Sequence, residues 1–158
     1  MISNTERFKE YFPQTLQQNL TPTLAEIFVT EKVKYFEQQK EFLFTIKENT
    51  NHTIIGLVYV KELLKKEGQG ELAYCMGYQY EGKGITSKAI AKIIDWSFEK
   101  AKLNTLQIIA HQSNHASVRI ALKNDFIWIK TLFKSHQTYD KKFLDMELYE
   151  LQKVNSAS

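Results

Sequence analysis

The sequence is poor in several residues that would direct its interpretation elsewhere. It has one cysteine, two prolines and only two arginines, Arg7 and Arg119. The lone Cys75 excludes an internal disulfide and a zinc site built from cysteines, and it favours a reducing, cytoplasmic environment. The longest apolar run, Ile54 to Val60, is far shorter than the roughly 20 residues that a membrane-spanning helix needs. The segment from Met1 to Thr5 lacks the pattern of a secretion signal.

The length and composition of the sequence fit one folded domain over residues 1–158. The 158 residues are 43% hydrophobic and 13% aromatic, which is enough to fill a core. The net charge is only +3, and lysines alternate with carboxylates, as in Lys61 to Glu67. A nucleic-acid surface would concentrate positive charge and use arginine. The charges therefore predict solvated faces, with neither nucleic acid nor membrane as a partner.

The first half of the sequence changes from a helical to an extended pattern. We predict a short helix from Glu6 to Phe12 that Pro13 stops, and a longer helix from Thr23 to Gln39. Thr23 and Glu26 have the spacing of a capping box. The inward stripe of the longer helix is predicted to be Ala25, Val29, Val33 and Phe36, widened by Ile27 and Phe28. Alternating or continuous apolar residues then predict an antiparallel meander of three strands, at Phe42–Ile46, Ile54–Val60 and Glu71–Tyr78.

The second half alternates between strands and helices. A helix follows the loop Tyr80–Gly84, a buried strand spans Thr105–Ala110, and a second helix starts at Asn114 with Val118, Ala121 and Leu122 inward. Two strands, Phe126–Phe133 and Phe143–Tyr149, precede a polar tail, Gln152–Ser158, that we expect to be frayed. The sequence thus predicts a mixed α/β (α+β) domain whose central twisted, mostly antiparallel sheet is flanked by about four helices.

The loop Glu81–Ser87 is the most informative segment. It lies between a strand and a helix, and Gly82 and Gly84 allow a sharp turn that exposes several amide groups. Together with the start of the helix, these amides can bind phosphate without basic side chains. The spacing of the glycines excludes a P-loop and a dinucleotide-binding fingerprint. An ordinary tight turn remains the alternative.

A second segment, His111–Ser117, also joins a strand to a helix. Asn114 is a good N-cap and Ser117 lies one turn further on. The alternative is that both residues only satisfy backbone groups of the helix. Two such junctions in succession, each at the carboxyl end of a strand, would converge on one cleft.

Four segments, taken in order, resemble the GNAT superfamily of acyl-CoA N-acyltransferases. They are Glu71-Leu72-Ala73-Tyr74, Gly82-Lys83-Gly84-Ile85, Asn114-x-x-Ser117 and Leu122-x-Asn124-x-Phe126. The resemblance extends from about Thr5 to Leu151 and is greatest to the RimJ/RimL type, which acetylates protein N-termini, particularly those of ribosomal proteins. It implies the GNAT fold, acetyl-CoA as co-substrate and no metal.

The resemblance also implies cofactor-binding residues. In a register anchored on the helix, the loop that cradles the coenzyme A diphosphate is Glu81–Thr86, with Glu81 where the family has Gln or Arg and Thr86 where it has Gly or Ala. A literal match, Gln79-x-x-Gly82-x-Gly84, shifts the loop by two residues, and either register keeps the amides of Lys83 to Ser87 near the phosphates. The implied contacts are Gly82, Lys83, Gly84, Ile85, Thr86 and Ser87 in the loop, Cys75, Met76, Gly77 and Tyr78 on the strand edge, and Asn114.

The catalytic roles implied by the resemblance fall on Ser117 and Glu71. Ser117 takes the position proposed to protonate the leaving thiolate. Glu71 matches a glutamate that acts as the base in some relatives. The alternative interpretation of Glu71 is an exposed charge on a strand. The RimL-type base position falls on Gln137, with His136 beside it as a possible substitute or a surface histidine. A backbone amide near Cys75 or Met76 would meet negative charge on the carbonyl oxygen. Cys75 itself is interpreted as a small core residue.

The expected function is transfer of an acetyl group from acetyl-CoA to a primary amine, by direct attack in a ternary complex. The acceptor is expected to be a protein or peptide N-terminus. Two alternatives stay open: a module that binds acyl-CoA without catalysing transfer, and a GNAT enzyme for a small-molecule amine. Family members usually have a strand and a helix before the segment matching Thr5–Pro13, whereas only Met1–Asn4 precede it here. We therefore expect an open sheet edge and a partly open acceptor cleft.

Overall fold

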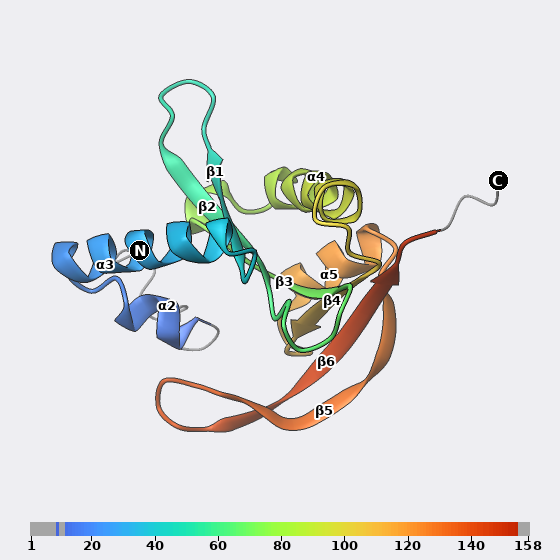
Figure 1. Cartoon of the computed structure of the whole chain (residues 1–158). Coiled ribbons are helices and arrows are strands. Elements are labelled where there is room, and N and C mark those ends of the chain that lie inside the picture. Colours follow the sequence, from blue (N-terminus) through green and yellow to red (C-terminus); the bar gives the residue numbers. More distant parts are fainter. Residues whose placement is uncertain (1–8, 10–11, 155–158) are drawn as a thin grey trace.

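Six strands form one mixed sheet in the computed structural model, which describes Lys9 and residues 12–154 (Figure 1). The strand order is β1-β2-β3-β4-β6-β5, and β3 and β4 are the parallel pair among otherwise antiparallel neighbours. The strands are β1 Phe42–Lys47, β2 Ile54–Lys61, β3 Gln69–Met76, β4 Thr105–Ala110, β5 Ile127–Gln137 and β6 Phe143–Gln152. The helices are α2 Pro13–Gln17, α3 Pro22–Glu37, α4 Ile85–Glu99 and α5 His115–Lys123, with a 3-10 turn, η2, at Tyr78–Tyr80. The mixed α/β architecture confirms the predicted fold class.

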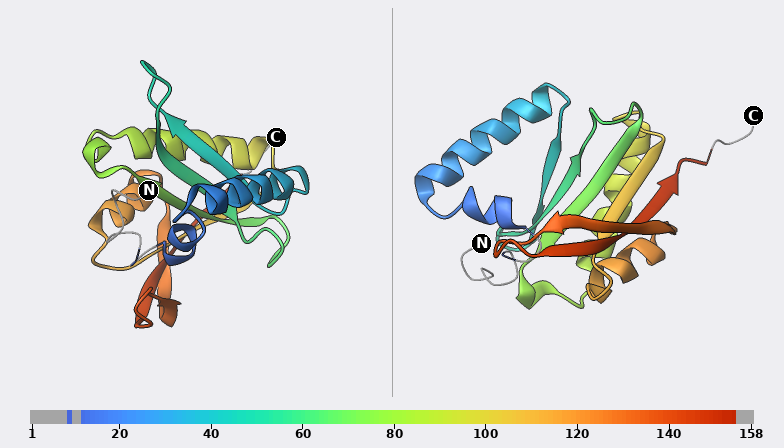
Figure 2. Two further views of the ribbon diagram at one scale, coloured as in Figure 1. Left: turned by 90° about the vertical axis from the view of Figure 1, so that its left-hand side faces the viewer. Right: turned by 90° about the horizontal axis from the view of Figure 1, so that it is seen from below.

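Helices cover both faces of the sheet (Figure 2). Val60 and Leu72 are partners on β2 and β3, and both pack in one buried cluster with Ile90 of α4. The neighbouring position Tyr59 points to the opposite face because side chains alternate along a strand. There its hydroxyl lies 3.4 Å from Thr15 Oγ1 of α2. Thus α4 and α5 lie on one face, and α2 and α3 on the other.

Helix α3 differs from its prediction at its start and in its orientation. Its N-cap is Thr21, whose hydroxyl accepts a hydrogen bond from Leu24 N at 3.2 Å, so the predicted capping box is wrong. Pro22 fits the first turn because it has no N–H to leave unpaired there. The predicted inward stripe is wrong in part, since Val29 and Val33 are 57% and 53% exposed, whereas Phe28, on its widened side, is 5% exposed.

The strands of the second half extend beyond their predicted ends. β5 runs to Gln137 and β6 to Gln152. Lys153 N then donates to Asn104 O at 2.8 Å, so the paired chain continues past the predicted start of the tail. In α5, Ala121 is fully buried as predicted, whereas Leu122 is 57% exposed.

The N-terminal predictions are only partly covered by the structure. The predicted helix from Glu6 to Phe12 lies largely outside the described residues. Pro13, predicted as a stop, is the first residue of α2. No helix in the described part of the chain is both long and apolar enough to cross a bilayer.

The hairpin of β5 and β6 reaches across to the N-terminal helices (Figure 2, right). At its tip, Tyr139 N donates a hydrogen bond to Lys9 O at 2.9 Å. This contact joins the hairpin tip to the N-terminal segment, and a cleft lies between the hairpin, α2 and β3.

Candidate active site

The cleft begins where β3 and β4 separate. Their ladder ends at the pair Leu72 and Ile108, although β3 continues to Met76 and β4 to Ala110. β3 stays paired with β2 as far as Met76. The second half of β3 therefore has a strand partner on one edge only, and its other edge faces a gap.

The register of β3 decides which of its backbone groups face this gap. Gly77 N donates to Ile55 O of the β2 side at 2.8 Å. Because hydrogen bonding alternates along an antiparallel ladder, Cys75 also bonds toward β2, while the backbone groups of Tyr74 and Met76 point to the opposite edge. Of the two amides suggested by the sequence, that of Met76 faces the gap and that of Cys75 does not.

The N-terminus of α4 lacks a side-chain cap. Its N-cap is Gly84, in the left-handed region with φ 72°, and this residue makes no side-chain cap hydrogen bond. By contrast, Thr21 caps α3 and Asn114 caps α5. The first amides of a helix have no partner within the helix, so those of Ile85 to Ser87 are available to a ligand. The helix also begins where the helix-anchored register of the glycine loop requires.

The space over the glycine loop is open. A Cβ built on Gly82 or Gly84 would meet no atom within 4 Å, and Gly82 also has a positive φ of 72°. Both positions line the cleft. The loop thus combines amides that have no partner within the helix, a helix N-terminus and free volume, which is the arrangement that suits a diphosphate.

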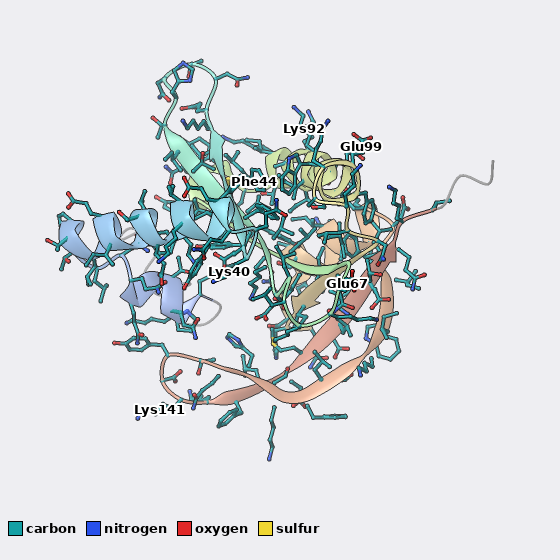
Figure 3. All side chains as sticks on the ribbon, viewed as in Figure 1. Lys40, Phe44, Glu67, Lys92, Glu99 and Lys141 are labelled. Carbon is teal, nitrogen blue, oxygen red and sulfur yellow. The ribbon has the colours of Figure 1, made fainter. Side chains whose placement is uncertain are left out.

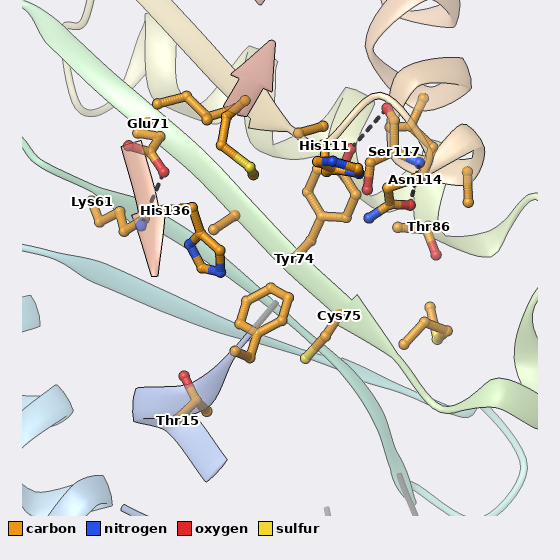
Figure 4. Close-up of a pocket in the computed structure, with 18 of the residues that line it drawn as sticks. Thr15, Lys61, Glu71, Tyr74, Cys75, Thr86, His111, Asn114, Ser117 and His136 are labelled. Atoms are coloured by element: carbon orange, nitrogen blue, oxygen red, sulfur yellow. Dashed lines mark hydrogen bonds and ion pairs between the residues drawn. The ribbon is translucent and has the colours of Figure 1, made fainter. Parts of the chain in front are cut away.

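Helix α5 forms the next part of the wall. Asn114 Oδ1 accepts from Ser117 N at 3.2 Å, which fixes the first turn. Tyr74 reaches across from β3, and its hydroxyl donates to Ser117 O at 3.3 Å (Figure 4). Burial raises the pKa of the Tyr74 phenol to about 12, so it remains a donor at neutral pH.

His111 lies at the end of β4 beside this helix. Its Nδ1 is 2.7 Å from Ser113 Oγ and also accepts Ser113 N–H at 3.3 Å. Since Nδ1 is an acceptor, we infer that the neutral ring carries its proton on Nε2. His111 lines the cleft.

The opposite end of the cleft carries further titratable groups. Lys61 Nζ lies 2.9 Å from Glu71 Oε1, and the Glu71 side chain is only 15% exposed. His136 is half-buried and Gln137 exposed, and both line the cleft. Figure 4 shows the Lys61–Glu71 pair and His136 at one end, Tyr74 between, and Thr86, Asn114 and Ser117 at the other.

Most of the predicted site residues come together in this cleft of about 1060 Å³. Those that line it are Glu71, Cys75, Met76, Gly82, Gly84, Ile85, Thr86, Ser87, Asn114 and Ser117. Gly77, Tyr78 and Lys83 do not. The N–H of Gly77 bonds to β2, Tyr78 is 65% exposed in η2, and Lys83 Nζ lies 5.5 Å from the centre of the Tyr80 ring.

Several lining residues were not predicted from the sequence. Tyr74 is the most informative, because its phenol bonds to the helix that carries Ser117. Its strand position alternates with Leu72 and Met76, so its place on the core face was available from the period of the strand. The hydrogen bond was not, since it joins residues 43 positions apart. Among the described residues, no cluster of three or more histidine, cysteine or acidic side chains could hold a metal ion.

Comparison with known proteins gives one family and several relatives. A family model described as an acetyltransferase (GNAT) domain matches residues 1–127. The uncharacterized N-acetyltransferase p20 of Bacillus licheniformis is 26% identical over 117 residues, which is 73% of this chain and 64% of that relative. The chain thus spans less than two thirds of the relative's length.

Two solved structures show the same fold. The ribosomal-protein-S5-alanine acetyltransferase of Vibrio fischeri superposes with a TM-score of 0.78 and 22% identity, covering 84% of this chain and 72% of that one. A spermidine N-acetyltransferase variant from Vibrio cholerae superposes with a TM-score of 0.69 and 18% identity, covering 82% and 75%.

Proposed function

The chain belongs to the acetyltransferase (GNAT) family, and from this premise we propose that it transfers an acetyl group from acetyl-CoA to a primary amine. One observation carries the proposal: the uncapped first turn of α4 and the open edge of β3 line the same cleft. The first suits a diphosphate and the second suits an extended arm that bears amides. Coenzyme A has both parts.

The order of the backbone groups along β3 suggests how acetyl-CoA lies in the cleft. An arm that starts at the amides of Ile85 to Ser87 and follows β3 toward the closed end of the gap passes Met76 before Tyr74. Acetyl-CoA supplies a thioester carbonyl for attack. The N–H of Tyr74 or Met76 would then donate to the carbonyl oxygen as negative charge develops there.

The proton transfers fall to residues at the two ends of the cleft. An amine that attacks a carbonyl must be neutral, and we propose that Glu71 takes its proton, directly or through water. Ser117, at the other end, protonates the leaving sulfur. His136 is the second group placed to accept a proton, and it is compared with Glu71 in the Discussion.

We propose a protein or peptide N-terminus as the acceptor. Support comes from the shape of the acceptor end, where the hairpin tip and α2 line one cleft and Tyr139 N bonds to Lys9 O. A cleft that is bounded by these two segments fits a narrow chain end. The structural neighbours include enzymes for a ribosomal protein and for spermidine, so a small amine is the competing acceptor.

The test is binding followed by turnover. Calorimetry should show binding of coenzyme A to the full chain, and Gly84→Ala should weaken it, because the added Cβ and the strained φ alter the amides of the first turn. Release of coenzyme A from acetyl-CoA should then require an added amine. Absence of binding would refute the proposal. Binding without release, over peptides and polyamines, would indicate the non-catalytic acyl-CoA module instead.

A further inference from the structure

The carboxylates at the acceptor end are already paired with lysines. Glu71 pairs with Lys61 at 2.9 Å, and Glu62 pairs with Lys65 at 3.1 Å. All four residues line the cleft. Each carboxylate is thus already largely neutralised by a lysine, so this part of the cleft offers little net attraction for a second positive charge.

The hairpin tip adds a positive charge to the same cleft. Lys141 lines the cleft, and no ion pair to it occurs within the described ranges. The carboxylate beside it, Asp140, pairs with Lys142 at 3.1 Å. Figure 3 shows Lys141 at the far end of the β5–β6 hairpin, well away from α4. The acceptor end thus has three lysines, Lys61, Lys65 and Lys141, against two carboxylates.

From this arrangement we infer that the site selects acceptors with one amine and an anionic flank, and that it rejects polyamines. The inference rests on the proposed function, since it names the acceptor class of the same site. The occupant is a peptide N-terminus followed by acidic residues. Its amine approaches the gap between β3 and β4, while its carboxylates face Lys65 and Lys141. Spermidine, with a cation at every amine, would meet these lysines unscreened.

The experiment compares three acceptors with the full chain and acetyl-CoA. They are the peptides Ala-Glu-Glu-Gly-Gly-Tyr and Ala-Lys-Lys-Gly-Gly-Tyr, and spermidine. We expect kcat/KM for the acidic peptide to exceed that for the others by about tenfold in about 50 mM salt, and the preference to shrink in about 500 mM salt because exposed charges are screened. Equal rates, or a preference for spermidine, would overturn the inference.

Charge-reversed variants give the matched control. Lys65→Glu combined with Lys141→Glu should abolish or invert the preference, and both side chains are exposed enough to change without loss of folding. Lys92→Glu makes the same kind of charge change on the outer side of α4 (Figure 3) and should leave the preference intact. An unchanged preference in the double variant, or an equal change in Lys92→Glu, would contradict the inference.

Peptide binding separates this inference from the proposed function. Anisotropy of the two labelled peptides, measured with coenzyme A present, should show tighter binding of the acidic one whether or not turnover occurs. Tighter binding of the basic peptide, or equal binding, would refute the acceptor class. Absence of acetyl transfer to every acceptor, with the acidic peptide still preferred in binding, would refute only the proposed reaction.

Discussion

The Tyr74 hydroxyl on β3 donates a hydrogen bond to the backbone carbonyl of Ser117 on α5, 3.3 Å away. The two elements lie on opposite sides of the gap in the sheet, so this bond connects the strand edge to the helix that carries the proposed proton donor. Its loss should affect the positions of both walls.

Tyr74→Phe should lower kcat by roughly tenfold and change KM for acetyl-CoA much less, because misplacement of a catalytic group costs turnover more than binding. The free energy of unfolding should fall by about 1 kcal/mol for the lost hydrogen bond. Steady-state kinetics and urea unfolding measure the two effects. Tyr78→Phe, at an exposed position outside the cleft wall, is the control. Equal kinetic effects of both variants would contradict a positioning role.

The buried phenols predict a loss of stability at alkaline pH. Burial raises the pKa of Tyr74 from 10.0 to about 12, so the unfolded chain loses this proton first. The stabilisation is complete below pH 10 and is lost as the pH rises toward 12, amounting to roughly 2–3 kcal/mol. Burial also raises the pKa of Tyr59.

Urea unfolding of the wild type and of Tyr74→Phe between about pH 9 and 12 tests whether ionisation of this phenol lowers the free energy of unfolding. The variant should lose less stability per pH unit, because one of the buried phenols is absent. Tyr139→Phe removes an exposed phenol and serves as the control. Parallel pH dependences in all three proteins would show that the Tyr74 phenol is not the group responsible.

Ser117→Ala should separate chemistry from binding. The hydroxyl is proposed to protonate the thiolate, and loss of a general acid typically costs about 10² in rate. The affinity for coenzyme A, measured by calorimetry, should change less than about twofold. Ser113→Ala, whose hydroxyl contacts His111, is the matched control. If turnover survives in Ser117→Ala, the thiolate obtains its proton elsewhere.

Comparing Glu71→Gln with His136→Gln identifies the base. With a peptide N-terminus as acceptor, Glu71→Gln should lower kcat/KM by about 10² near pH 7. The defect should shrink above about pH 8, where the free amine is largely deprotonated already. His136→Gln should show a smaller defect over the same pH–rate profile. The reverse order would assign the proton transfer to His136.

The sequence predicted those features that depend on neighbouring residues. Thr105–Ala110 and the Asn114 cap follow directly from a short apolar run and from N-cap chemistry, and both are confirmed. The glycine loop was placed before α4 for the same reason, since a helix of strong periodicity begins at Ile85. Predictions of this kind need no knowledge of distant contacts.

Features that depend on pairing between distant segments were not accessible. Whether Cys75 or Met76 faces the gap is set by the register of β3 against β2, and a shift of one residue reverses it. The orientation of α3 was ambiguous because its apolar residues lie nearly all round the helix. In the structure Phe28 is buried, and Lys32 Nζ lies 5.7 Å from the centre of the Tyr59 ring. The N-cap was misplaced by two residues because Thr21 and Thr23 both flank Pro22.

The main-chain bond between Tyr139 and Lys9 limits the cross-section of anything that enters beneath the β5–β6 hairpin. Under the proposed function, a lysine on the surface of a folded protein would enter this space less easily, because it brings a broad, rigid neighbourhood with it. An unfolded terminus is only one backbone wide and can thread under the hairpin. Modification would then have to occur on an exposed chain end, for example before a nascent partner has packed that end against its own surface.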